Sequence, residues 1–332
     1  MIRTAILGAS GYVGGELLRL IAAHPALAPV KLYGDSKAGQ PVSAVHPHLA
    51  AAYPDSAIDR FEGDLSNIDL VFAALPHGHS QKIAGEIVGT GVPFVDLGAD
   101  FRLSDAATYA KWYGHEHEAP ELLGSFVYGI PELNRGAIRG AKAVAAAGCY
   151  ATAAILALKP LKGLIKANSI IVNAASGVSG AGREAKEATA FNTVDGSLTA
   201  YGLLNHRHTA EMQMALGGTL LFTPHLAPMN RGILATCYAE AEGPCEPLGR
   251  LTDAYADEPF VTVTNDPPAT KWVTGSNGAL VTARYDKRTN RILALCAIDN
   301  LGKGAAGQMF QCANLMLGLE ETAGLSTIGV YP

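Results

Sequence analysis

The sequence predicts an α/β protein with two parts, a Rossmann-type dinucleotide-binding domain and a second α+β domain built on a mixed or antiparallel sheet. Two observations predict this architecture. Near the N-terminus a buried strand, a glycine-rich turn and a helix follow one another, as in dinucleotide-binding folds. In the second half, six strand-like segments follow one another with few helices between them. A chain of 332 residues is long enough for two domains.

The first strand covers Ile2 to Leu7, and a helix follows over Glu16 to Ala23. Between them, the glycines have the spacing G-x-x-G-x-x-G instead of the commoner G-x-G-x-x-G. In such a turn the first glycine permits the tight bend, the second lets a pyrophosphate approach, and the third lets the helix pack on the strand. The alternative is a glycine-rich turn in an ordinary α/β domain. The residues that we expect to bind the cofactor here are Gly8, Ser10, Gly11, Val13 and Gly14.

A second strand, Val30 to Tyr33, leads to the residues expected beside the adenine ribose. Asp35 suits a free 2′-hydroxyl group and so NAD, whereas Ser36 and Lys37 suit a 2′-phosphate and so NADP. The residues alone leave this choice open.

A third strand, Ile68 to Leu75, and a helix-like segment, Gln81 to Val88, continue the pattern. Loops at the carboxyl ends of parallel strands gather at the ligand crevice, so we expect Pro76 to Ser80 and Asp96 to Arg102 to line it. Arg102 suits a phosphate or carboxylate, and a structural ion pair with Asp96 or Asp100 is the alternative.

Cys149 follows a run of small residues and comes just before an apolar, helix-favouring stretch, Thr152 to Lys159, that ends at Pro160. At a helix N-terminus, unpaired N–H groups and the positive dipole end stabilise a thiolate. Gly148 lets the backbone approach a substrate carbonyl group. Cys149 is therefore a candidate nucleophile, and a buried structural cysteine is the alternative.

The second half of the chain carries the strands of the second domain, and a final helix covers Lys303 to Leu319. The strand-like segments are Ser169–Ala174, Gly218–Phe222, Gly232–Ala239, Phe260–Thr264, Ala279–Ala283 and Arg291–Ile298.

A cysteine nucleophile needs a proton acceptor, and histidine titrates near neutral pH. His206 and His208 precede a predicted helix. Either can pair with Cys149 in space, and Glu211 can orient one of them. The alternative is a pair of surface histidines at a helix start. Four His-x-His pairs, at 46/48, 77/79, 115/117 and 206/208, raise the question of a metal site. None completes a recognised zinc spacing, so we expect no metal.

Two further glycine-rich turns, at 176–183 and 300–304, offer backbone N–H groups to a nicotinamide or a phosphate. Their candidate cofactor ligands are Ser179, Gly180 and Asn300, and simple turns are the alternative in each case.

Composition restricts the class of protein. The net charge of −5 without a basic run makes nucleic acid an unexpected partner. Five scattered cysteines argue against a disulfide framework and for a reducing compartment. Glycines interrupt the apolar N-terminus, and no run of eighteen apolar residues follows, so we expect a cytoplasmic protein without membrane contact.

Taken together, the motifs resemble the N-acetyl-γ-glutamyl-phosphate reductases, relatives of aspartate-semialdehyde dehydrogenase, over nearly the whole chain. The motifs that carry this resemblance occur in the order Gly8–Gly14, His46–Leu49, Ala74–Gly78, Asp96–Arg102, Tyr128–Leu133, Gly148–Tyr150, Ser176–Arg183, His206–His208 and Asn300–Gly304.

The resemblance implies NADP-dependent reduction of an acyl phosphate to an aldehyde, the activity of an NADP-dependent acyl-phosphate oxidoreductase in arginine biosynthesis. Cys149 matches the family's catalytic cysteine, which forms a thioester, and His206 and His208 match its histidine pair, with His208 favoured as the acid–base. Arg102, Arg207 and Glu211 become candidates for binding substrate. The position after Gly148-Cys149-Tyr150 is usually proline and here is Ala151, and Asp35 stands where a 2′-phosphate would bind.

The resemblance also implies that the C-terminal helix returns to the nucleotide domain. The expected domains are 1–148 plus 303–332 for the dinucleotide and 149–302 for catalysis, and the expected assembly is a homodimer or homotetramer. The rival functions are the same chemistry on N-acetyl-aminoadipyl phosphate or aspartyl phosphate, since one methylene is worth only about 1–3 kcal/mol in a pocket. A non-catalytic NADP-binding sensor is the rival from another class.

Overall fold

The computed structural model describes residues 1–332, which divide into two compact units. Unit 1 comprises Met1–Ala147 with Ala305–Leu325, and unit 2 comprises Gly148–Gly304 with Ser326–Pro332. The sequence predicts all of 303–332 in the first domain, but the last residues join unit 2. The reason is local pairing, since Asn277 N donates to Ser326 O at 2.7 Å and Val330 N donates to Thr274 O at 2.8 Å.

Unit 1 is a parallel sheet in the order β2-β1-β3-β4-β6-β5. Neighbouring side chains along each strand point to opposite faces, so Ile6 and Phe72 pack in one core while Leu7 and Ala73 pack in the other. The strands are β1 (Ile2–Leu7), β2 (Leu27–Tyr33), β3 (Leu70–Ala73), β4 (Phe94–Asp96), β5 (Phe126–Gly129) and β6 (Ala143–Ala146).

Helices cover both faces of this sheet. Leu17 of α1 and Phe310 of α10 belong to the first core, whereas Ala84 and Ile87 of α3 belong to the second. The helices of unit 1 are α1 (Tyr12–Ala22), α2 (Val42–Val45), α3 (Ser80–Gly89), α4 (Ala106–Tyr113), α5 (Pro131–Arg139) and α10 (Gly307–Met316). The predicted Rossmann-type domain is confirmed.

Unit 2 is a mixed sheet in the order β11-β12-β13-β10-β7-β9-β8, with β7–β9 and β11–β12 parallel and the other pairs antiparallel. Each of the six strands expected in this half is present. The strands are β7 (Ile170–Ser176), β8 (Thr199–Ala200), β9 (Leu220–Leu226), β10 (Ile233–Glu240), β11 (Val261–Val263), β12 (Ala279–Asp286) and β13 (Arg291–Ile298).

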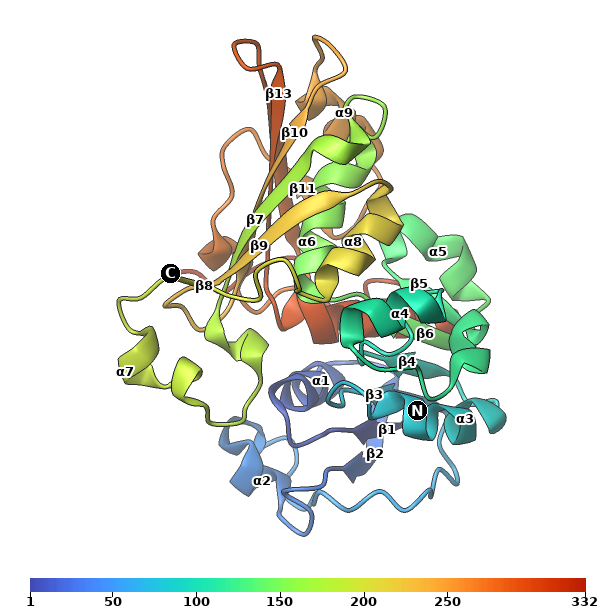
Figure 1. Ribbon diagram of the computed structural model, residues 1–332. Coiled ribbons are helices and arrows are strands. Elements are labelled where there is room, and N and C mark those ends of the chain that lie inside the picture. The colour runs from blue at the N-terminus through green and yellow to red at the C-terminus, as the bar shows by residue number, and fades with distance from the viewer. The chain divides into compact units, whose positions relative to one another are not determined.

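One face of this sheet is covered by α6 (Cys149–Leu158), α8 (His208–Leu216) and α9 (Pro247–Ala254), as Figure 1 shows. The short helix α7 (Phe191–Val194) belongs to an exposed stretch of the same unit. Along β10, Ala235 and Cys237 face the helices and are fully buried, whereas Leu234 and Tyr238 alternate with them and stay half-exposed. The helix-free face therefore presents apolar side chains to solvent.

The last helix does not begin as the sequence predicts. A π-helical turn, Gly302–Ala306, precedes α10, which ends at Met316. π-Helical turns are rare in proteins, and those that occur are often found at functional sites. No helix in the structure combines the length and the apolar character needed to cross a bilayer.

Candidate active site

Cys149 is the first residue of α6, where the sequence predicts it. Gly148 is the N-cap, with φ −69° and ψ 148°, and Thr152 N closes the first turn by donating to Gly148 O at 2.8 Å. The rest of α6 is buried, whereas the Cys149 thiol is partly exposed and free of any disulfide. A reachable sulfur at the first helical position lies within the positive end of the helix dipole, which stabilises a thiolate.

Glu211 connects the cysteine helix to the histidine helix. Its Oε2 atom accepts a hydrogen bond from Gly148 N at 2.9 Å, and its Oε1 atom lies 3.7 Å from Nε2 of His208. The carboxyl group is fully buried. The predicted role of orienting a histidine fits this geometry, and the bond to Gly148 is one that sequence reasoning missed.

The two histidines lie against aromatic rings beside the cysteine helix. The His206 and His208 ring centroids are 4.8 Å apart, and those of Tyr150 and His206 are 5.6 Å apart. His208 N donates to Nδ1 of His206 at 3.2 Å, which makes Nδ1 an acceptor. Burial, with the nearby Arg207 guanidinium second, lowers the pKa of His206 to about 4. His206 is therefore neutral near pH 7.

Gly304, in the π-helical turn, lies close to Cys149. A Cβ atom added to Gly304 would lie 2.8 Å from Cβ of Cys149 and 3.3 Å from Asp299 O. Position 304 therefore tolerates glycine alone, and the lack of a side chain there keeps space beside Cys149.

Two further predicted residues, Ser179 and Asn300, lie together in unit 2. Asn300 Nδ2 donates to Ser179 Oγ at 2.9 Å, and Asn300 Oδ1 accepts from Gly232 N at 2.7 Å. A Cβ on Gly180 would lie 3.1 Å from Ser176 Oγ, so the turn at 176–183 leaves little room for a side chain at this position.

Asp299 stabilises the turn at 300–304, and the sequence alone does not identify it as a site residue. Its buried carboxylate accepts from Leu301 N at 2.8 Å, from Gly302 N at 3.0 Å and from Arg231 Nε at 2.8 Å. The available signal was an acidic residue at the end of an otherwise apolar strand.

The glycine-rich turn of unit 1 has the geometry that an approaching phosphate needs. Gly8 has φ +86°, and a Cβ there would lie 2.3 Å from Ala74 O. A Cβ on Gly14 would lie 2.3 Å from Gly8 O. Gly11 is the N-cap of α1 and makes no side-chain hydrogen bond. The first backbone N–H groups of the helix are therefore not capped by a side chain at this position.

The other predicted cofactor residues lie in exposed loops after neighbouring strands. Asp35, Ser36 and Lys37 follow β2 and are exposed, and Pro76 follows β3. Because β1 pairs with both β2 and β3, these loops and the glycine-rich turn share one edge of the sheet.

Arg102 is buried and donates to Leu97 O at 2.6 Å, so part of its hydrogen-bonding capacity serves the fold of unit 1. Asp96 is fully buried and accepts from Ser80 Oγ and Gly98 N, both at 2.8 Å. Burial raises the pKa of Asp96 to about 7 despite these bonds. Arg207 is half-buried at the N-cap of α8.

No three or more histidine, cysteine, aspartate or glutamate side chains are grouped so as to hold a metal ion. Two of the His-x-His pairs instead contribute a ring to the fold of unit 1. His46 Nε2 bonds to Ala9 O and His117 Nε2 bonds to Asp100 O, each at 2.8 Å.

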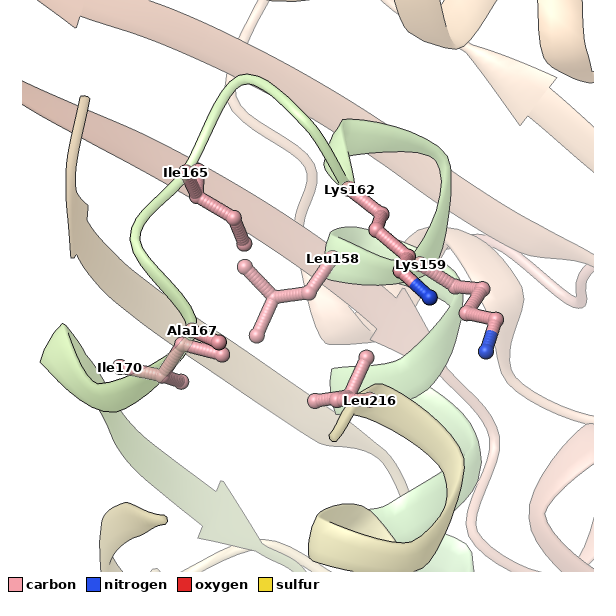
Figure 2. A pocket seen from close by; sticks show the side chains of 7 residues that line it. All are labelled: Leu158, Lys159, Lys162, Ile165, Ala167, Ile170 and Leu216. Carbon is pink, nitrogen blue, oxygen red and sulfur yellow. The ribbon is translucent and has the colours of Figure 1, made fainter. Parts of the chain in front are cut away.

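A small apolar pocket lies at the C-terminal end of α6, the opposite end from Cys149 (Figure 2). Leu158, Leu216 and three further apolar residues line it together with Lys159 and Lys162. Apart from the amines of these two lysines it holds no carboxylate, histidine or thiol, and it lies at the other end of α6 from Cys149.

Comparison with known proteins adds two family models and many relatives. Residues 3–141 match the semialdehyde dehydrogenase NAD binding domain, and residues 149–300 match the semialdehyde dehydrogenase dimerisation domain. The chain is 44% identical to the N-acetyl-gamma-glutamyl-phosphate reductase of Heliobacterium modesticaldum and 46% identical to that of Desulforudis audaxviator. In both comparisons each chain is covered completely.

Solved structures share the fold at low identity. Aspartate semialdehyde dehydrogenase II from Vibrio cholerae, complexed with ASA, matches with a TM-score of 0.73 at 18% identity, covering 96% of this chain and 98% of the other. The enzyme from Candida albicans, solved with NADP, matches with a TM-score of 0.71 at 15% identity, covering 96% and 98%.

Proposed function

The chain belongs to the semialdehyde dehydrogenase family and, within it, to the N-acetyl-γ-glutamyl-phosphate reductases, and on this premise we propose its reaction and the residues that perform it. It reduces N-acetyl-γ-glutamyl phosphate to N-acetylglutamate semialdehyde and phosphate, using NADPH. The observation that carries the proposal is Cys149 at the start of α6, joined through Gly148 and Glu211 to the histidine helix. Unit 2 then performs catalysis and unit 1 binds the dinucleotide.

Cys149 is the nucleophile. Its thiolate attacks the γ-carbonyl carbon, the carbon–sulfur bond forms, and the bond from carbon to the phosphate oxygen breaks, which leaves a thioester and inorganic phosphate. Backbone N–H groups at the start of α6 are suited to the negative charge on the carbonyl oxygen. The bound nicotinamide supplies the hydride that reduces the thioester. The oxygen of the resulting thiohemiacetal takes up the proton that the acid–base removed from the thiol. When the oxygen returns this proton, the carbon–sulfur bond breaks, and the thiolate and the aldehyde are released.

His208 is the acid–base that we favour. It accepts the thiol proton before the attack and exchanges the hydroxyl proton afterwards. The Glu211 carboxylate, 3.7 Å from Nε2, favours the protonated imidazole that forms in each case. His206 has a pKa of about 4, is a weak base, and holds the His208 backbone through Nδ1.

The residues of unit 1 fit a dinucleotide. The space that a side chain at Gly8 or Gly14 would fill is occupied by backbone, so the turn closes tightly enough to expose N–H groups to a pyrophosphate. The proposed ligands of unit 1 are Gly8, Ser10, Gly11, Val13, Gly14 and Pro76. Within unit 2, Ser179, Gly180 and Asn300 stay predicted cofactor residues. Ser36 and Lys37 are exposed donors for a 2′-phosphate, which favours NADP over NAD despite Asp35.

Arg207 is the proposed ligand for the negative groups of the substrate, because it is half-buried beside His206 and His208. Arg102 is the second candidate. Glu211 is completely buried and hydrogen-bonded to Gly148, so we assign it to positioning instead of substrate contact.

The helix-free face of the unit 2 sheet is the proposed contact between two copies of the chain. Ile171, Tyr238 and Leu293 lie side by side across β7, β10 and β13 and are half-exposed. Residues 149–300 match a domain described as a dimerisation domain, which supports a second copy as the occupant. The absence of a disulfide among the five cysteines supports the reducing cytoplasm as the compartment.

The reverse reaction tests this function. Purified protein would be mixed with N-acetylglutamate semialdehyde, phosphate and NADP⁺, with NAD⁺ and aspartate semialdehyde in parallel reactions, while nicotinamide absorbance is followed. Phosphate-dependent formation of NADPH with the first substrate is the expected result. Activity with another aldehyde alone would change the substrate, and NADP binding without turnover of any aldehyde would indicate a sensor.

A further inference from the structure

His46 belongs to a sequence motif, His46-Pro47-His48-Leu49, that the reaction does not use. The residue lies between α2 and a 3₁₀ turn, Pro47–Leu49, and only 3% of it is exposed. Its Nε2 atom is 2.8 Å from Ala9 O. A carbonyl oxygen can only accept, so Nε2 carries the proton and donates it to the glycine-rich turn.

Gly15 makes room for this ring. A Cβ added to Gly15 would lie 2.6 Å from Cε1 and 2.7 Å from Nδ1 of His46. The ring is therefore wedged between α1 and the carbonyl of Ala9, although Gly15 itself is helical and needs no unusual backbone angle.

The bond to Ala9 O fixes one peptide plane of the turn. The N–H groups of Gly8 and Ala9 already donate to Tyr33 O, at 2.9 and 2.8 Å, so this part of the chain is held from β2. In a trans peptide the C=O and the following N–H point in opposite directions. Holding Ala9 O toward His46 therefore directs the Ser10 N–H to the other side of the turn, and a reversed plane would present an oxygen there instead.

We infer that His46 is a positioning residue for dinucleotide binding, which sets the Ala9–Ser10 peptide so that the turn presents an N–H group to the pyrophosphate. The inference rests on the proposed function, because it takes the turn as the dinucleotide site. The pyrophosphate is common to NADPH and NADH, so loss of the donor weakens both cofactors by the same factor. The hydride and thiol chemistry stays intact at saturating cofactor.

The test compares three variants by fluorescence titration with NADPH and NADH and by steady-state kinetics. His46→Phe keeps a ring without a donor, and His46→Gln places an amide N–H near the position of Nε2. His48→Phe is the matched control, because His48 is exposed in the same motif. We expect His46→Phe to raise both dissociation constants about tenfold, with kcat kept, and His46→Gln to restore most of the affinity.

A second set of variants keeps the test decisive if His46→Phe folds poorly. Gly15→Ala pushes on the ring and should weaken both cofactors in the wild type, whereas in a His46→Ala background it should have little further effect. Unchanged cofactor affinity in His46→Phe and Gly15→Ala, or equal losses in the Phe and Gln variants, would overturn the inference. Failure of the wild type to bind either dinucleotide would instead overturn the proposed function.

Discussion

The backbone amide of Gly148 donates a hydrogen bond of 2.9 Å to the carboxylate of Glu211, 63 residues further along the chain. The same carboxylate lies 3.7 Å from Nε2 of His208, so one buried group lies beside both the peptide before the proposed nucleophile and the proposed acid–base. Glu211 therefore connects the two helices that carry the proposed thiol and its proposed base, both within unit 2.

Glu211→Gln separates the charge of this residue from its hydrogen bond. The amide oxygen still accepts from Gly148 N, but the negative charge beside His208 is lost. The pKa of the histidine should fall, so the acid limb of the pH–rate profile should move to lower pH, and kcat should drop about tenfold near pH 7. An unchanged pH profile would contradict a role through His208.

Cys149→Ser replaces the thiol with a hydroxyl group that the helix dipole cannot ionise near pH 7. We expect reduction to be abolished and NADPH affinity, measured by fluorescence titration, to be retained. Mass spectrometry of the wild type with the acyl phosphate and no cofactor should detect a covalent acyl adduct that the variant lacks. Residual turnover in the variant would exclude the thioester route.

Replacing His206 or His208 with asparagine should lower kcat by different factors. His208→Asn should lower kcat by about 10²–10⁴, the usual contribution of a general acid–base. His206→Asn should cost less, because His206 has a pKa of about 4 and contacts the His208 backbone. The reverse ranking would assign the acid–base role to His206.

Asp96 should make the stability of the protein depend on pH. Burial raises its pKa to about 7 in the folded state, above the ordinary value of 3.8 in the unfolded chain. Between about pH 4 and pH 7 the folded state holds the extra proton, so the free energy of unfolding should fall as the pH rises through this window. Asp96→Asn imitates the protonated carboxyl group.

Urea unfolding at pH 5 and pH 8 checks this expectation. The wild type should lose more stability between these values than Asp96→Asn does. Asp55→Asn, an exposed position in the same unit, is the control and should follow the wild type. An equal loss of unfolding free energy between pH 5 and pH 8 in the wild type and Asp96→Asn would refute this role of Asp96.

Tyr238→Arg places a charge at the centre of the helix-free sheet face. If two copies meet there, light scattering after size-exclusion chromatography should show dissociation to monomers, with the circular dichroism spectrum unchanged. Val30→Arg makes the same kind of change at an exposed apolar position of unit 1 and should leave the assembly intact. Equal behaviour of both variants would exclude this face.

Sequence reasoning located the elements that carry strong local signals. The first strand, the glycine turn and the six strands of unit 2 have apolar runs or fixed glycine spacings, and Cys149 was placed at a helix start because small residues precede an uninterrupted apolar stretch. The sequence does not predict β5 and β6, because β6 is mostly alanine and β5 is a short segment that ends at a glycine. Such segments become strands by pairing with neighbours.

The connections within the site were harder to predict. The Gly148–Glu211 bond and the Asp299–Arg231 pair join residues more than sixty positions apart, at 63 and 68, so no local pattern records them. The role of Gly304 likewise depends on which atoms face it. The sequence identified the residue types, and the tertiary structure determines their partners.

The closeness of Gly304 and Cys149 also bears on how the chain passes from one unit to the other. Unit 2 begins at Gly148 and its main segment ends at Gly304, so the point where the chain enters this unit touches the point where it leaves. Domains with adjacent ends can be inserted into a host fold without disturbing it. The protein can thus be regarded as a dinucleotide-binding host that carries the proposed catalytic module as an insertion, with Cys149 one residue after the point of entry.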